Sequence, residues 1–119
     1  MTFKLKKYDS KRYDDEIYNC LHFAVDAYHD ISGHDMGLYV SELMTGRDKR
    51  RVIVRKLKEF KPIINPINTC LAVMHGAELH IGIYHDGKII HFNEQGVQAQ
   101  PPYIAEINHG RIKYYAISH

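Results

Sequence analysis

The segment LHIGIYHDGKIIHF, residues 79–92, constrains the fold of this chain more than any other stretch. It contains two apolar runs joined at Asp86-Gly87, a dipeptide that strongly favours a two-residue type I′ turn between antiparallel strands. The turn also sets the register, which pairs Tyr84 with Ile89, Gly82 with His91, and His80 with Asn93. The sequence therefore predicts a tight β-hairpin with a defined pairing.

Alternation of side chains divides this hairpin into two faces. The apolar face is the expected core face and holds Ile81, Ile83, Ile90 and Phe92. The other face holds His80, Gly82, Tyr84, Ile89, His91 and Asn93. His80 and His91 are diagonal neighbours, about 7–8 Å apart at the backbone and within side-chain reach. Because Gly82 has no side chain, we expect open space beside the two imidazoles, an arrangement typical of a site.

The periodicity of the remaining chain changes near its middle. Apolar residues recur at helical spacing over 18–31, and Gly33 is a plausible stop; 38–44 and the basic segment 48–60 are also predicted helices. The basic helix has a narrow apolar stripe of Val52, Leu57 and Phe60, and Pro62 and Pro66 close this helical half. Strand patterns follow at 69–74, 79–84, 88–92 and 111–117. The predicted fold class is α+β, with N-terminal helices packed on a C-terminal antiparallel β-sheet in a single domain, 1–119.

The composition narrows the cellular setting. No run approaches the length of a membrane span, and the N-terminus lacks the apolar core of a secretory signal. We therefore expect synthesis in the cytoplasm and no membrane span. Two cysteines are too few for a disulfide framework, so one of them is available for chemistry.

The two cysteines differ in their surroundings. Cys20 lies in the first turn of its predicted helix, where the helix dipole and the N–H groups of that turn stabilise a thiolate. A nearby imidazole would stabilise the thiolate further as an ion pair. Cys70 lies in the apolar run 69–74 and is interpreted as a core residue. Cys20 is the candidate nucleophile.

These residues together resemble a known family. A cysteine at a helix start, the strand His-Ile-Gly-Ile-Tyr at 80–84 and the run Gly-Lys-Ile-Ile-His at 87–91 are similar to the NlpC-type cell-wall peptidases. Residues 66–74 resemble the strand that leads into the family's histidine strand, and residues 91–97 resemble versions found in bacteriophage tail proteins. The resemblance covers about residues 18–31 and 62–100 and implies the papain-like NlpC-type fold.

The resemblance implies a cysteine peptidase or amidase that cleaves an amide bond in peptidoglycan stem peptides, a cell-wall hydrolase with no metal and no other cofactor. Cys20 would attack the carbonyl carbon, and His80 would act as general base and later protonate the leaving amine. His91 would orient the His80 ring. Asn93 is the alternative orienting residue because the turn register places it opposite His80, but the diagonal geometry favours His91.

The resemblance also implies an oxyanion site at the helix start. The backbone N–H of Cys20 would contribute to it. A tyrosine from an upstream loop commonly lines this site in the family, and Tyr8 and Tyr13 are the candidates here. The sequence has Asn-Cys-Leu-His at 19–22 where the family has Asp-Cys-Ser-Gly. The missing Ser-Gly supports an alternative, a papain-like effector that acts on protein as a deamidase or acyltransferase.

Two further alternatives concern metals and nucleic acid. Four of the nine histidines, His75, His80, His85 and His91, suggest zinc, but no Cys/His cluster has a recognised spacing, and the sequence predicts no metal. Residues 47–61 contain eight Lys or Arg against two acidic residues, which allows a non-catalytic binding module for nucleic acid. We favour a solvated helix face that attracts the anionic cell wall. Without a secretory signal, delivery would require a phage tail, lysis or a dedicated secretion apparatus.

Overall fold

The hairpin predicted from Asp86-Gly87 is present in the computed structural model, which describes residues 20–36, 51, 53–55 and 57–117. Asp86 and Gly87 have φ angles of 54° and 78°, as a type I′ turn requires. Gly82 pairs with His91 and Tyr84 with Ile89, so the predicted register is confirmed at both pairs.

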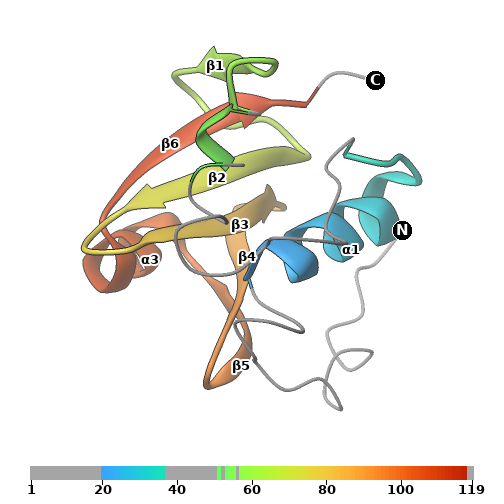
Figure 1. Cartoon of the computed structure of the whole chain (residues 1–119). Coiled ribbons are helices and arrows are strands. Elements are labelled where there is room, and N and C mark those ends of the chain that lie inside the picture. The colour runs from blue at the N-terminus through green and yellow to red at the C-terminus, as the bar shows by residue number, and fades with distance from the viewer. Residues whose placement is uncertain (1–19, 37–50, 52, 56, 118–119) are drawn as a thin grey trace.

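This hairpin belongs to a six-stranded sheet in which every neighbouring pair is antiparallel (Figure 1). The strands are β1 (Lys61–Ile63), β2 (Cys70–His75), β3 (Leu79–His85), β4 (Lys88–Asn93), β5 (Gly96–Gln100) and β6 (Arg111–Ala116). Their order across the sheet is β1-β6-β2-β3-β4-β5. The C-terminal strand β6 thus lies between β1 and β2, and β1 and β5 form the two edges.

One face of the sheet is covered by helix α1 (Cys20–Ser32), which packs against β3 and β4. The predicted helix over 18–31 is therefore confirmed from Cys20 onward. It stops where predicted, because Gly33 has φ 78° and its N–H donates to the carbonyl of His29 at 2.8 Å. The main core lies between α1 and the sheet, and it contains the four predicted hairpin core residues, Ile81, Ile83, Ile90 and Phe92.

The opposite face carries helix α3 (Pro102–His109), so α1 and α3 lie on opposite sides of β3 and β4 (Figure 1). A second, smaller core forms there from Ala72, Met74, Ile89 and Ala105. Pro102 is at the helix start, where the missing N–H costs nothing, and Gly110 ends the helix with φ 103°. His80 and His91 of the hairpin belong to this second face.

The predicted fold class, a papain-like NlpC-type α+β fold with N-terminal helices on a C-terminal sheet, is wrong for the part of the chain that the structure describes. That part is mostly antiparallel sheet with one long helix, α1, and otherwise short elements. Helix α3 lies between β5 and β6 in the sequence, after most of the strands. The reason is that segments not predicted as strands extend the sheet. Residues 61–63 pair with β6 despite Pro62, because an edge strand tolerates a proline, and residues 96–100 pair with β4.

Only part of the helical half can be compared with the prediction. Residues 51, 53–55 and 57 are helical, which agrees with a basic helix, but residues 58–60 form turns and the helix ends earlier than predicted. Ile53 and Phe60 are buried, and Leu57 packs beside them. The predicted helix at 38–44, Val52 and the segment before Cys20 lie outside the described residues. Among the described helices, none has the length and apolar character needed to cross a bilayer.

Candidate active site

The predicted proximity of His80 and His91 is confirmed by a direct contact between their rings. Nε2 of His80 lies 3.0 Å from Nδ1 of His91, and the ring planes are nearly perpendicular at 89°. Strand pairing at Gly82 and His91 brings the two side chains to the same face, and His80 reaches diagonally across the pair. The hairpin alone therefore assembles the first two members of the site.

His91 is the buried polar side chain of the site, with 0% exposure. Both of its ring nitrogens are bonded, because Nε2 lies 2.8 Å from Oε1 of Gln100 on the neighbouring strand β5. Burial is the main reason that the pKa of His91 lies below its ordinary value; the Gln100 bond opposes this effect and nearby His109 adds to it. His91 is therefore held as a neutral imidazole.

The Gln100 contact determines which nitrogen of each imidazole carries the proton. An amide oxygen only accepts, so Nε2–H of His91 donates to Gln100 and Nδ1 of His91 keeps its lone pair. That lone pair accepts the Nε2–H of His80. His80 in its neutral form then has its own lone pair on Nδ1. This chain of two hydrogen bonds prepares His80 to accept a proton at Nδ1.

A third imidazole joins these two from helix α3. The ring of His109 stacks on His80 with centroids 4.3 Å apart, and it meets His91 edge-on with centroids 4.9 Å apart. Burial lowers the pKa of His109 from its ordinary value. One ring nitrogen from each of the three histidines lies within 4.8 Å of the other two. We call His80, His91 and His109 the histidine cluster.

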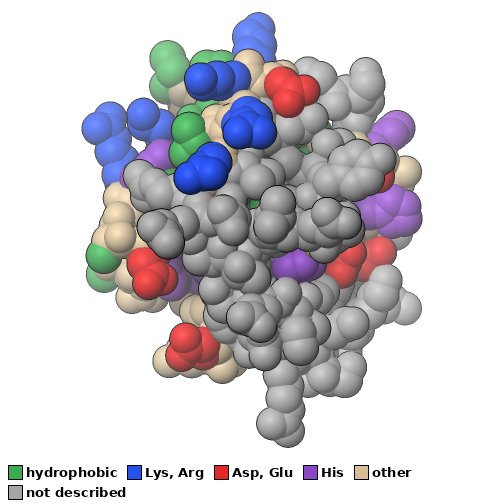
Figure 2. Space-filling view, in the orientation of Figure 1, with side chains coloured by type: hydrophobic (Ala, Val, Ile, Leu, Met, Phe, Trp, Pro, Cys, Tyr) green, Lys and Arg blue, Asp and Glu red, His purple; other side chains and the backbone are tan. Residues whose placement is uncertain are grey.

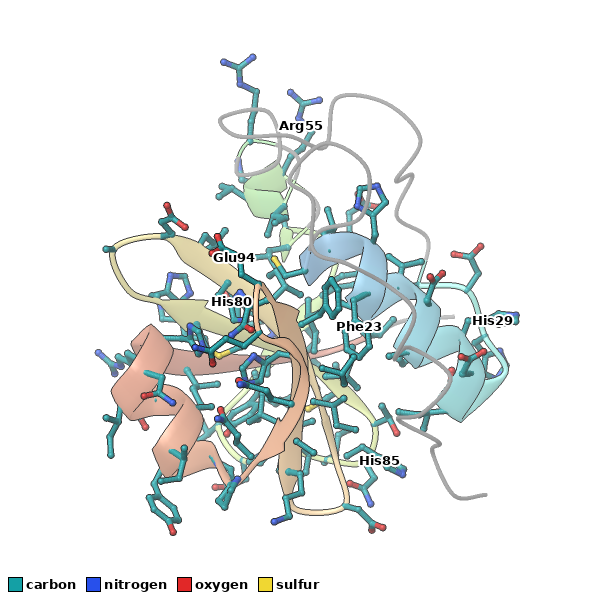
Figure 3. All side chains as sticks on the ribbon, turned by 90° about the horizontal axis from the view of Figure 1, so that it is seen from below. Phe23, His29, Arg55, His80, His85 and Glu94 are labelled. Atoms are coloured by element: carbon teal, nitrogen blue, oxygen red, sulfur yellow. The ribbon has the colours of Figure 1, made fainter. Side chains whose placement is uncertain are left out.

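A polar cleft of about 870 Å³ opens beside the histidine cluster. His80, Gln100 and His109 line it, together with amide side chains of the β4–β5 turn and the carboxylates Glu78 and Glu94. Figure 3 shows Glu94 close to His80 at the same end of the sheet, whereas the labelled Arg55 and His29 lie well away from it. The cluster is thus accessible from solvent through His80 and His109, while His91 lies behind them.

Two details of the predicted geometry need correction or refinement. The open space expected beside Gly82 is absent: Gly82 is buried, and a Cβ there would lie 2.9 Å from the Ile90 carbonyl oxygen and 3.1 Å from Cβ of His91. Glycine is needed because the strands pack closely there, not because it leaves a gap. Asn93 turns to the β4–β5 connection, where its Oδ1 accepts from the Gln95 N–H at 2.8 Å.

The predicted nucleophile Cys20 is the first residue of α1 and has 1% exposure. Cys20 belongs to the main core. Ile81 and Phe92, the residues that directly follow His80 and His91 in the sequence, belong to the same core. The start of α1 lies beside β3 and β4 in Figures 1 and 3. The pairing of Cys20 with His80 stays a prediction. Tyr8 and Tyr13 lie outside the described residues.

Cys70 lies in β2 with 0% exposure, and burial raises the pKa of its thiol. These observations agree with the interpretation of Cys70 as a core residue. Of the other histidines considered for zinc, His85 bonds to the Thr69 hydroxyl at 2.8 Å, and His75 lines a different groove. Neither contributes to the histidine cluster.

Sequence reasoning missed Gln100 and His109. The chain contains a signal for each. Gln98 and Gln100 alternate with Val97 and Ala99 in a short run that follows a Gly-containing turn. His109 ends a segment bounded by Pro101-Pro102 and Gly110. These signals predict a strand and a helix. They do not indicate that the two elements converge on the hairpin histidines.

The fold and the site together define a protein class: a mainly antiparallel β-sheet with a cluster of three imidazoles between the sheet and helix α3. Comparison with protein-family models, with curated proteins and with solved structures finds no match to the chain.

Proposed function

We propose that this protein is a thiol-dependent hydrolase of amide bonds, in which Cys20 is the nucleophile, His80 the general base and His91 the orienting residue. The observation that carries the proposal is the 3.0 Å contact between His80 Nε2 and His91 Nδ1. Through His91, the oxygen of Gln100 holds the ring plane and the tautomer of His80 and leaves Nδ1 of His80 as the basic atom.

The proposed reaction requires the Cys20 thiol to reach His80. Nδ1 of His80 takes the proton of the Cys20 thiol, and the thiolate sulfur bonds to the carbonyl carbon of the substrate. The C–N bond then breaks, and the amine leaves with the proton that His80 returns. Water hydrolyses the thioester, which releases the acid and restores the thiol. Cys20 begins α1, so N–H groups of the first helical turn would stabilise both the thiolate and the oxyanion.

The proposed substrate is a peptidoglycan stem peptide. The similarity of residues 80–91 to the histidine strands of cell-wall peptidases supports this choice. The composition of the cleft agrees with a peptide ligand, because Asn93, Gln95, Gln98 and Asn108 offer both donors and acceptors to peptide groups.

The experiment that tests this function is mass spectrometry of purified muropeptides after incubation with the protein. Cleaved stem peptides are expected from the native chain and from Cys70→Ala, but not from Cys20→Ala. If muropeptides remain intact while a protein glutamine is deamidated or acylated, the alternative of an effector that acts on protein replaces the cell-wall assignment. If neither reaction occurs, the hydrolase proposal is wrong.

We expect Cys20 to be the more reactive thiol in the folded protein. Both thiols are buried, but only Cys20 begins a helix, where first-turn N–H groups stabilise a thiolate, whereas burial raises the pKa of Cys70 without such compensation. Limiting iodoacetamide at neutral pH, followed by peptide mass spectrometry, should label Cys20 before Cys70. In urea-unfolded protein the two thiols should react at similar rates. Faster labelling of Cys70 in the folded chain would remove Cys20 from the nucleophile role.

A basic patch, defined here as Arg51, Arg55 and Lys58, lies apart from the histidine cluster. All three side chains are exposed, and blue side chains gather over this part of the molecule in Figure 2. In Figure 3 the labelled Arg55 is far from His80. We therefore propose that the patch attracts an anionic surface such as the cell wall and takes no part in the chemistry.

Replacing all three residues of the basic patch by glutamine should weaken binding to anionic wall fragments. The loss should shrink at high salt, because screening already weakens the native interaction there. Co-sedimentation at two salt concentrations measures this, with Lys88→Gln at the β3–β4 turn as the matched control. Turnover of a small uncharged substrate should barely change. A collapse of that turnover would place the patch in the active site, and tight binding of nucleic acid instead of wall would favour the non-catalytic binding module.

A further inference from the structure

The histidine cluster contains more than a thiol hydrolase requires. Orientation of His80 needs His91 and Gln100, yet His109 brings a third imidazole against both rings. The three donor nitrogens lie within 4.8 Å of one another, although His109 comes from a different element than the hairpin. Three convergent imidazoles on rigid elements are the ligand set of many zinc centres.

The backbone holds His109 firmly at this position. It ends α3, and Gly110 closes the helix by donating its N–H to the carbonyl of Glu106 at 2.9 Å. Gly76, in the turn between β2 and β3, lies so close that a Cβ there would collide with the carbonyl of His109. Because this turn leads directly into β3, the close approach ties the end of α3 to the strand that carries His80.

The chemistry of the three donors suits a divalent transition metal. A metal needs neutral imidazoles, and the full burial of His91 disfavours a charged ring there. Nδ1 of His91 offers its lone pair to the cluster, while its Nε2–H is held by Gln100, the kind of supporting bond that metal-binding histidines usually have. Tetrahedral Zn²⁺ with bonds of about 2.0–2.1 Å needs donor nitrogens roughly 3.4 Å apart. Rotations of His80 and His109 would bring the nitrogens together.

We propose that His80, His91 and His109 bind one Zn²⁺ ion, with the fourth coordination position open to the polar cleft. The metal would take Nε2 of His80, which leaves the only ring proton on Nδ1. A metal-bound His80 therefore has no lone pair for the proton of Cys20, and zinc would inhibit the hydrolase reversibly. The inhibition rests on the proposed function, whereas the metal site does not.

Isothermal titration of metal-free, tag-free protein with Zn²⁺ tests the site, and Co²⁺ absorption reports the geometry. One ion per chain is expected, with a tetrahedral cobalt spectrum. His109→Gln should weaken binding by at least about tenfold, because even loss of a supporting residue commonly costs that much. The matched control His29→Gln, an exposed histidine on α1, should bind like the native chain. Equal affinity of His109→Gln and native protein would overturn the proposal.

Two further measurements remove the remaining ambiguities. In long-range ¹H–¹⁵N spectra of the native chain, zinc should shift the ring nitrogens of all three cluster histidines and spare those of His29 and His34. This readout requires no variant to fold. Cys20→Ala should retain zinc, and its loss there would mean that a thiolate is a ligand and that the three-histidine site is wrong.

The inhibition is measured separately, on an active substrate. Zinc should abolish turnover at the concentration that saturates the site in titration, and a chelator should restore it. Zinc binding without any hydrolase activity would refute the proposed function and leave the metal site intact. Activity that persists with the site saturated would refute the inhibition.

Discussion

Cys20→Ala and His80→Ala are each expected to reduce amide hydrolysis by about 10⁴–10⁶-fold, because a nucleophile and its base act as a unit. His91→Ala should cost about 10²–10⁴-fold, since an orienting residue fixes ring geometry and tautomer but transfers no proton to substrate. Asn93→Ala should cost less than about tenfold. Its side chain bonds to the Gln95 N–H in the β4–β5 turn, whereas His91 contacts the His80 ring directly.

Initial rates on a stem-peptide substrate give these values, with far-UV circular dichroism and urea titration to verify that each variant is folded. Gln100→Leu extends the series, because it removes the acceptor that sets the His91 tautomer. Its rate should fall between those of Asn93→Ala and His91→Ala. A folded Asn93→Ala variant that is slower than His91→Ala would transfer the orienting role to Asn93.

Phe92→Ala is expected to lower the free energy of unfolding by about 3–5 kcal/mol, the range for removing a large buried aromatic side chain. Phe92 has 0% exposure and its ring stacks on Phe23 of α1, with centroids 5.6 Å apart. The pair joins β4 to α1, so it connects the strand of His91 to the helix that begins at Cys20. The variant should therefore lose activity at temperatures below its unfolding midpoint.

Urea unfolding followed by circular dichroism measures the loss. Tyr103→Ala is the matched control, because this aromatic ring on α3 is 66% exposed and its removal should change stability by no more than about 0.5 kcal/mol. A loss below about 1 kcal/mol for Phe92→Ala would show that α1 is not held to the sheet through this contact.

Local sequence was sufficient to predict the hairpin and its two faces. Asp86-Gly87 requires positive φ angles that few other dipeptides accept, and a tight turn leaves a single register for the strands that it joins. The pairing of Gly82 with His91 follows from that register, as does the approach of His80 to His91. The helix that begins near Cys20 and ends at Gly33 was likewise readable from spacing and a stop residue.

The fold class could not be predicted in this way, because pairing with distant strands decided the structure of weakly patterned segments. Residues 61–63 contain a proline and residues 96–100 are mostly polar, so neither has a strong strand pattern. Both are strands because β6 and β4 offer their backbone groups as partners. The same pairing places β6 inside the sheet, which no local signal indicates.

The residues of the candidate site also fall into two groups, those that the sequence predicted and those that only the tertiary structure brings together. The sequence by itself determined His80 and His91, since one turn relates them across eleven positions. Only the tertiary structure decided that Gln100 backs His91 and that His109 closes the cluster, because β5 and α3 reach the hairpin through sheet pairing and packing on Ala72, Met74 and Ile89. Contacts within a hairpin depend on a local backbone preference. Contacts between elements depend on burial of apolar surface, which is non-directional, so the sequence pattern does not show which elements pack together.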